Sequence, residues 1–358
     1  MSVTIALAGN PNCGKTTMFN ALTGANQYVG NWPGVTVEKK EGKLKNQKDV
    51  TVTDLPGIYS LSPYTLEEVV SRDYLLKEKP DVIIDLVDAT NIERNLYLAT
   101  QLLEIGIPVV IALNMVDLLK KNNIHINVKG LSSALGCPIV ETSALKGTGL
   151  KEVVDEAIKC ANQHRVPSKQ MEFPKAVEKA VNEIEGFVPA NIAEENKRWY
   201  AVKLLERDSK VKEGLNLPAS AQSRIEEIAS GLEKAEDDDT ESIVTDGRYQ
   251  YIQKIVSANV KRSGNKMTVS DKIDRIVTNR VLGLPIFILT MFIVYYVSVT
   301  TVGTMVTDWT NDSFVGTIQG VVSDGLGNAG VADWLVSLVS DGIIGGLGAV
   351  LGFVPQMA

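Results

Sequence analysis

Short apolar runs alternate with helix-like patterns over the first 162 residues. Five runs of mostly aliphatic side chains, bounded by turn residues, predict strands at 3–8, 51–54, 82–87, 109–113 and 137–141. The stretches between them have helical periodicity, at 17–23, 65–77, 92–104 and 149–161. This alternation predicts an α/β domain at 1–162, with a mostly parallel sheet covered on both faces.

The pattern changes after residue 162. Residues 163–173 contain Pro167 and Ser168 and are typical of a linker. Residues 174–258 are rich in Ala, Glu, Lys, Leu and Ile and lack strand-like alternation. They predict a small all-α domain, with helices at 174–185, 194–206, 219–235 and 240–260.

An uncharged apolar stretch at 281–302 predicts a transmembrane helix. As a helix it rises about 33 Å, enough to cross the hydrocarbon core of a bilayer. A basic juxtamembrane linker, 259–280, precedes it with Lys261, Arg262, Lys266, Lys272, Arg275 and Arg280. The positive-inside rule then places residues 1–280 in the cytoplasm. The alternative is a buried helix in a soluble core.

The remaining residues predict a second approach to the membrane. Residues 303–340 are small, polar and acidic, and we expect them on the non-cytoplasmic side. A further apolar stretch begins within 341–358 but is too short to span. We therefore expect this segment to be the start of a second membrane segment that continues in the natural protein.

Composition sharpens this picture through its asymmetry. Hydrophobic residues make up 44% and charged residues 22%, which excludes a disordered chain. The net charge of −7 argues against nucleic acid as a partner. All 36 Lys and Arg residues lie at or before Arg280, so the tail carries no positive charge. The 3 cysteines are too few and too scattered for a disulfide scaffold.

The first candidate for chemistry is the loop GNPNCGKT at 9–16, which follows the first strand and precedes a helix. It matches the phosphate-binding pattern G-x-x-x-x-G-K-[ST]. Backbone N–H groups of such a loop cradle phosphates, and the helix N-terminus adds its dipole. Lys15 would reach the β- and γ-phosphates, and the Thr16 hydroxyl would bind Mg²⁺. The loop residues expected at the nucleotide are Gly9, Asn10, Pro11, Asn12, Cys13, Gly14, Lys15, Thr16 and Thr17.

Three further motifs follow in the order of a GTPase. Residues 54–57 (DLPG) follow a strand, so Asp54 can hold Mg²⁺ and the Gly57 N–H can sense the γ-phosphate. Residues 114–117 (NMVD) resemble the guanine motif N-K-x-D, in which the Asp accepts two hydrogen bonds that adenine cannot supply. The guanine loop would comprise Asn114, Met115, Asp117 and the SAL residues Ser143, Ala144 and Leu145.

Thr36 is the candidate switch I threonine, which would complete the Mg²⁺ shell when the γ-phosphate is present. Together the motifs predict a Ras-like P-loop GTPase that binds GTP and GDP. Two positions depart from that class. Met115 replaces the motif's lysine, which predicts weak nucleotide affinity. Ile58 stands where a glutamine usually orients water, so hydrolysis is slow or assisted by another group.

Other reactive side chains give weaker signals. Cys13 is either a redox-sensitive thiol at a helix N-terminus or simply a small tolerated residue, and we favour the second. Glu67 and Glu68 could contact iron, but we expect both to be solvated. His125 and His164 show no metal-ligand spacing.

The combination resembles the FeoB family of bacterial ferrous-iron transporters. The resemblance rests on GNPNCGKTT, NWPGVTVE at 31–38, DLPG and NMVD, then a helical domain and a membrane span. It covers the whole chain, and GGLGAVLGFVPQM at 345–357 resembles the opening of the family's first gate region. The chain would be the N-terminal portion of such a transporter.

This resemblance implies further roles. Asn12 matches the asparagine of potassium-activated GTPases and would ligate K⁺, with switch I carbonyls near Asn31 and Trp32. The K⁺ would act where other GTPases use an arginine finger. A simple turn residue is the alternative for Asn12. Asn12, Lys15, Thr36 and Gly57 would then serve catalysis.

The resemblance also implies a place and partners for the protein. The helical domain would slow GDP release and couple nucleotide state to Fe²⁺ uptake, with Fe²⁺ as transported substrate. We expect a cytoplasmic (inner) bacterial membrane location, contact with the lipid bilayer, small accessory iron-transport proteins and a homo-oligomer. The alternative function is a membrane-tethered regulatory GTPase that transports nothing.

Overall fold

The computed structural model describes residues 2–24, 27–45, 47–169, 171–262, 277 and 283–357. Their contacts divide the chain into two compact units, Met1–Gly264 and Asn265–Ala358. We describe each unit by itself.

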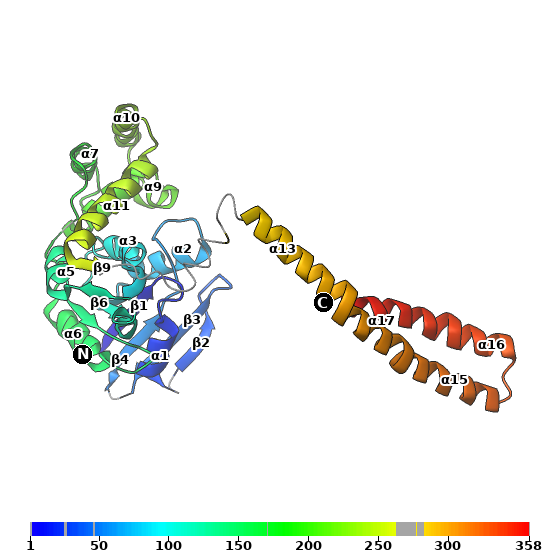
Figure 1. Cartoon of the computed structure of the whole chain (residues 1–358). Helices are drawn as coiled ribbons and strands as arrows, with labels where there is room; N and C mark the ends of the chain where they lie inside the picture. The colour runs from blue at the N-terminus through cyan, green and yellow to red at the C-terminus, as the bar shows by residue number, and fades with distance from the viewer. Residues whose placement is uncertain are drawn as a thin grey trace. The chain divides into compact units, whose positions relative to one another are not determined.

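The first unit is built on a seven-stranded sheet of order β2-β3-β4-β1-β5-β6-β8 (Figure 1). The parallel strands are β1 (Val3–Gly9), β4 (Gln47–Asp54), β5 (Val82–Asp88), β6 (Val109–Asn114) and β8 (Ile139–Glu141). Two antiparallel strands, β2 (Gln27–Asn31) and β3 (Glu38–Leu44), extend the edge beside β4. The mostly parallel sheet predicted from the sequence is confirmed.

Helices cover both faces of this sheet. One face packs on α1 (Lys15–Thr23) and α6 (Leu150–Gln163), whose Phe19 and Val153 are fully buried. The other face packs on α2 (Leu66–Asp73), α3 (Ile92–Leu102) and α5 (Val128–Leu135). Short turns complete the domain at η1 (Tyr74–Glu78), η2 (Ala89–Asn91) and α4 (Val116–Leu119).

An all-α domain follows, with helices in each of the four predicted ranges and a fifth, α9, that the sequence did not predict. Its members are α7 (Lys175–Glu185), α8 (Glu194–Leu205), α9 (Ser209–Leu215), α10 (Ala219–Glu236) and α11 (Thr240–Asn259). Trp199 of α8 lies at its centre, 1% exposed. The connection from α6 to α7 is packed rather than loose, because Met171 and Phe173 are buried in the same core.

Buried ion pairs join the α/β and helical parts. Arg248 of α11 meets Glu104 after α3, with Nη2 and Oε2 2.7 Å apart, and both side chains are at most 2% exposed. Arg72 of α2 pairs with Asp208 at 2.7 Å. A small two-stranded sheet of β7 (Ile124–Ile126) and β9 (Val260–Arg262) also ties the end of the helical domain to the α/β domain.

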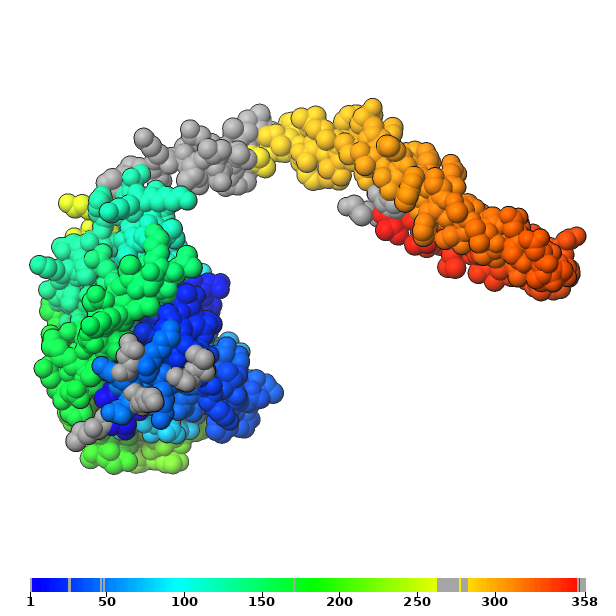
Figure 2. Space-filling model, turned by 90° about the horizontal axis from the view of Figure 1, so that it is seen from below, coloured from blue at the N-terminus to red at the C-terminus, as the bar shows by residue number. Residues whose placement is uncertain are grey.

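The second unit is a helical hairpin. Its first helix runs without interruption over Gly283–Asn328, through α13 (Gly283–Tyr295), η3 (Tyr296–Thr301), α14 (Val302–Asp308), η4 (Trp309–Val315) and α15 (Gly316–Asn328). The return helix comprises α16 (Asp333–Ser337), η5 (Leu338–Ile344) and α17 (Gly345–Met357). Figures 1 and 2 show the orange and red helices side by side. Gln319 Nε2 donates to the Ser340 carbonyl at 3.0 Å across the pair.

Both helices of the hairpin are long and apolar enough to cross a membrane. The first helix continues past residue 302, and the second helix with an apolar stretch begins at Asp333, before the expected boundary at 341. The 46-residue helix would rise about 69 Å, so less than half of it fits a hydrocarbon core of about 30 Å. Residues 281–302 as the crossing part stay a prediction. Lys266, Lys272, Arg275 and Arg280 of the predicted basic linker lie outside the described residues.

Candidate functional site

The four predicted loops meet at one edge of the sheet. They follow β1, β4, β6 and β8, which are parallel, so their carboxyl ends share that edge. The register aligns Leu7 with Asp54 and Asp88 with Asn114. Sequence order and strand direction thus suffice to assemble residues that are a hundred positions apart.

The loop after β1 has a backbone that few residue types can adopt. Gly14 has φ 95°, and a Cβ there would lie 2.5 Å from the Asn114 side chain. Asn12 also has a left-handed backbone, φ 66°, and its side chain is exposed. Glycine is needed for the close approach, whereas asparagine tolerates the left-handed turn.

Lys15 and Asp54 form the charged centre of the site. The Lys15 ammonium lies 2.7 Å from Asp54 Oδ1 and also donates to the Leu55 carbonyl. Burial raises the pKa of Asp54, and the neighbouring Lys15 opposes this shift. Oxygen donors from Asp54 and the adjacent Thr16 hydroxyl suit a hard divalent cation such as Mg²⁺.

Gly57 and Ile58 rest against the phosphate loop. A Cβ on Gly57 would lie 3.2 Å from Pro11 Cα, and the Ile58 N–H donates to the Gly9 carbonyl at 3.3 Å. The Ile58 side chain is 2% exposed and packs in the core. It therefore points away from any position where it could orient water.

Asn114 joins three of the loops through one side chain. Its Nδ2 donates to the Cys13 carbonyl at 2.8 Å, and its Oδ1 accepts from the Ala144 N–H at 2.9 Å. Thr142 Oγ1 lies 3.3 Å from the same Oδ1. The side chain fixes the spacing between the phosphate loop and the SAL loop.

Asp117 is held by the SAL loop as well. Ser143 Oγ donates to its Oδ1 at 2.9 Å, and Lys146 Nζ lies 3.2 Å from its Oδ2. These two contacts hold the pKa of Asp117 below its ordinary value. Beside it, Met115 adopts φ 63°, and Leu145 is 86% exposed. Sequence reasoning missed Lys146, for which the signal is its position directly after Ser143–Leu145.

The predicted switch I residues differ in burial. Trp32 is buried, and its ring centroid lies 5.2 Å from that of Tyr74. Its backbone N–H donates to the Val37 carbonyl at 2.9 Å. Asn31 is exposed at the end of β2, and Thr36 is exposed in the β2–β3 connection. Among the described residues, no hydrogen bond or ion pair joins Thr36 to the phosphate loop, so its predicted Mg²⁺ role stays a prediction.

Of the side chains with weaker signals, Cys13 fits the favoured interpretation and Glu68 does not. Cys13 is 1% exposed, and burial raises the pKa of its thiol to about 12, which favours a small packed residue over a reactive thiol. Glu68 is not solvated as expected: it is 8% exposed, accepts from Ser60 Oγ at 2.9 Å and closes a capping box with Thr65. Glu67 is exposed as expected.

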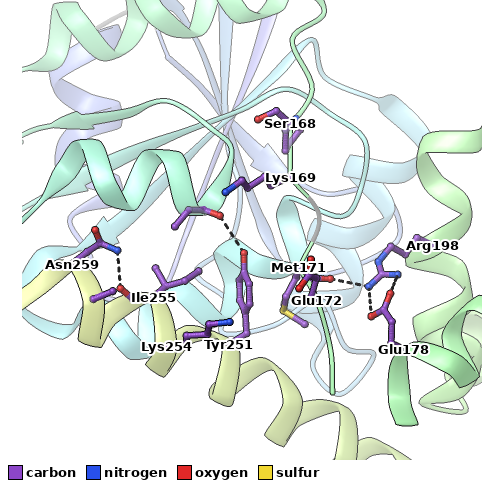
Figure 3. Close-up of a pocket in the computed structure, with 13 residues that line it drawn as sticks. Ser168, Lys169, Met171, Glu172, Glu178, Arg198, Tyr251, Lys254, Ile255 and Asn259 are labelled. Carbon is purple, nitrogen blue, oxygen red and sulfur yellow. Dashed lines mark hydrogen bonds and ion pairs between the residues drawn. The ribbon is translucent and has the colours of Figure 1, made fainter. Parts of the chain in front are cut away.

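A cleft of about 840 Å³ lies apart from these loops, between the α6–α7 connection and α11 (Figure 3). Tyr251 donates to the Ala134 carbonyl there, and Arg198 binds Glu178 and the Met171 carbonyl. The cleft marks the seam between the two domains. No group of three or more His, Cys, Asp or Glu among the described residues could hold a metal ion.

Comparison with known proteins supports the motifs. Residues 3–157 match the family model of ferrous iron transport protein B, and residues 173–261 match that of the FeoB cytosolic helical domain. A GDP-bound point mutant of the S. thermophilus FeoB G-domain is 47% identical, with a TM-score of 0.70, over 72% of this chain and 100% of that one. The chain belongs to the FeoB family.

Other FeoB proteins extend the match. A structure of S. thermophilus NFeoB bound to GDP·AlF₄⁻ and K⁺ is 48% identical over 71% of this chain and 99% of that one, with a TM-score of 0.66. The Fe(2+) transporter FeoB of Escherichia coli K12 is 37% identical over 99% of this chain but only 46% of its own length. The Porphyromonas gingivalis Fe(2+) transport protein A/FeoB fusion is 38% identical over 99% of this chain and 43% of its own length. The chain thus spans less than half the length of these curated relatives.

Proposed function

We propose that this chain is the GTP-hydrolysing cytoplasmic part of a bacterial Fe²⁺ transporter, together with its first membrane helices. The observation that carries the proposal is the meeting of four nucleotide loops at one sheet edge, with Asn114 bonded to two of them. Family membership supplies the transported ion. The 99% coverage by Fe(2+) transporters favours this function over a membrane-tethered regulatory GTPase.

The phosphate end of the site follows from the charged centre. Lys15 binds the β- and γ-phosphates, and backbone N–H groups of the Gly9–Thr17 loop, in which Pro11 alone has none, cradle them. Thr16, Asp54 and Thr36 would hold Mg²⁺, which when bound neutralises phosphate charge. Gly57 lies close to Pro11, with room for little more than its hydrogen at the Cβ position, and its N–H would sense the γ-phosphate.

The base end provides guanine specificity. Asp117 accepts the N1 and N2 hydrogen bonds of guanine, and Asn114 fixes the loops on either side. Ser143, Ala144 and Leu145 border the base. The exposed Leu145 and the half-buried Met115 offer it apolar contact. Because Met115 replaces the lysine of the N-K-x-D motif, we expect weaker binding of guanine nucleotides but no loss of selectivity for guanine.

Potassium would take the role of the missing water-orienting glutamine. Asn12 presents an exposed amide beside the phosphates, and the switch I carbonyls near Asn31 and Trp32 would complete its site. The buried Ile58 leaves hydrolysis to backbone groups and to such a cation. A relative with bound GDP·AlF₄⁻ and K⁺ supports this assignment.

Coupling would run from switch II to the helical domain. Arg72 of α2 is paired with Asp208, and Tyr64 donates to Glu241 of α11. A change in residues 54–60 would therefore reach the helical domain. The helical domain would slow GDP release and pass the change on to the membrane part. The membrane location, a homo-oligomer and small accessory iron-transport proteins are part of this proposal.

The test is GTP hydrolysis by the full chain in detergent, in KCl against NaCl. We expect K⁺ to raise the rate by at least about tenfold, because it stabilises charge in the transition state. Asn12→Ala should remove the response. Asn123→Ala is the matched control, since Asn123 is also exposed and left-handed (φ 53°) but lies outside the site. Equal rates of wild type in the two salts would refute the potassium role, and absence of hydrolysis would refute the enzyme.

A further inference from the structure

The carboxylate that reads guanine is already engaged on both oxygens by one loop. Ser143 Oγ donates to Asp117 Oδ1 at 2.9 Å, and the Lys146 ammonium lies 3.2 Å from Oδ2. The Asp117 side chain is 18% exposed and that of Lys146 is 60% exposed. The neutral partner therefore sits on one oxygen and the charged partner on the other.

The backbone fixes the place from which Lys146 reaches. Ser143 and Thr148 exchange two backbone hydrogen bonds, at 3.0 and 3.2 Å, and the Lys146 N–H donates to the Ser143 carbonyl at 3.1 Å. Gly147 turns the loop with φ 71°, and α6 follows from Leu150. The closed loop thus presents the lysine and the serine to the same carboxylate.

Guanine offers two donors to this group, N1–H and the amino group on C2. They take the two oxygens of one carboxylate side by side. A carboxylate can accept further hydrogen bonds. A cation beside Oδ2, however, reduces the negative charge on that oxygen and takes the space from which a guanine donor would reach it. The hydrogen bond from the Ser143 hydroxyl weakens guanine binding to Asp117 much less, because the hydroxyl carries no charge.

We propose that Lys146 is a specificity-determining residue that competes with the guanine C2 amino group for Asp117 and so weakens guanine nucleotide binding. The inference rests on the proposed guanine site. Lys146 acts as a built-in substitute for one donor of the base, and guanine must displace it. This favours rapid release of GDP, in addition to the effect of Met115.

The test compares GDP with inosine diphosphate, which keeps N1–H but lacks the C2 amino group. Affinities are measured by calorimetry on the full chain in detergent with Mg²⁺. Lys146→Ala should bind GDP about two- to fivefold more tightly than wild type, the range of an exposed ion pair, and change inosine diphosphate binding less. Lys146→Arg keeps the cation and should resemble wild type.

Two controls isolate the contact. Lys151→Ala removes the same charge from an exposed position in α6 and should leave both affinities unchanged. At 0.5 M NaCl the difference between wild type and Lys146→Ala should shrink, because salt screens an exposed pair.

Three results would overturn the inference: weaker GDP binding by Lys146→Ala, equal shifts for the two nucleotides, or no shift for either. Wild-type protein that binds neither nucleotide would instead refute the proposed function, so the two failures are distinguishable.

Discussion

Asn114 shows what the residue scale adds to a motif. The sequence predicts that an asparagine belongs at this position, but not that its two amide atoms bind the Cys13 carbonyl and the Ala144 N–H. Those contacts depend on loop conformations set by tertiary packing. The same holds for Lys146, because its position directly after Ser143–Leu145 places it near the site but does not predict its ion pair with Asp117.

Asp85 is a buried acid outside the nucleotide loops. It lies within β5, 1% exposed, and its Oδ2 has no hydrogen-bond partner among the described residues. Burial raises its pKa to about 7. Its electrostatic neighbours include the thiols of Cys13 and Cys137, both buried.

This raised pKa predicts a pH-dependent stability. Above the unfolded pKa of about 4 the folded chain holds a proton that the unfolded chain loses, so stability falls as pH rises to about 7 and then levels. Asp85→Asn should therefore raise the free energy of unfolding at pH 8 by at most about 4 kcal/mol, and change it little near pH 4. Thermal unfolding at the two pH values measures this difference. Asp155→Asn, on the exposed face of α6, is the control. A pH-independent difference would contradict the assignment.

Elements with a regular apolar pattern were predictable. The five parallel strands and the main helices follow from hydrophobic runs and from 3.6-residue periodicity. Strands β2 and β3 were missed, since QYVGN and EKKEGKL contain few apolar residues and form an antiparallel edge of the sheet. Such strands are specified by their neighbours, which a linear pattern does not show.

Helix α2 connects switch II to the helical domain through one buried contact. Arg72 Nη1 and Asp208 Oδ2 are 2.7 Å apart, and both side chains are at most 3% exposed. Asp208 also caps α9 by accepting from the Val211 N–H at 3.0 Å. The pair thus links α2 of the α/β domain to the start of α9 in the helical domain.

Removing one partner of the Arg72–Asp208 pair should leave the other charge buried and unpaired. Arg72→Met is expected to cost about 3–5 kcal/mol of unfolding free energy in urea titrations. Asp208→Asn keeps the cap, and in the double variant it should recover part of that loss, because the unpaired charge is gone. Strictly additive effects in this double-mutant cycle would show that the contact carries no coupling.

At the scale of the whole molecule, the sequence indicated three parts with different chemistry. The G domain and the helical domain each match a family model, at 3–157 and 173–261. The helical hairpin was predicted less well, because Asp333 and Asp341 interrupt the apolar pattern of the return helix and obscured its start. Charge distribution, rather than hydropathy, gave the predicted orientation.

The most direct test of the account is Fe²⁺ uptake by cells that carry the intact transporter with Asp117→Asn and no other route for Fe²⁺. Asp117→Asn replaces one carboxylate oxygen with an amide NH₂ donor, so guanine loses at least one of its two specific hydrogen bonds and the charge of the acceptor. We therefore expect the initial uptake rate to fall to background at equal protein level. Asn123→Ala should leave uptake unchanged. If the Asp117→Asn variant no longer hydrolyses GTP but takes up Fe²⁺ at the wild-type rate, the claim that this nucleotide site controls transport is contradicted.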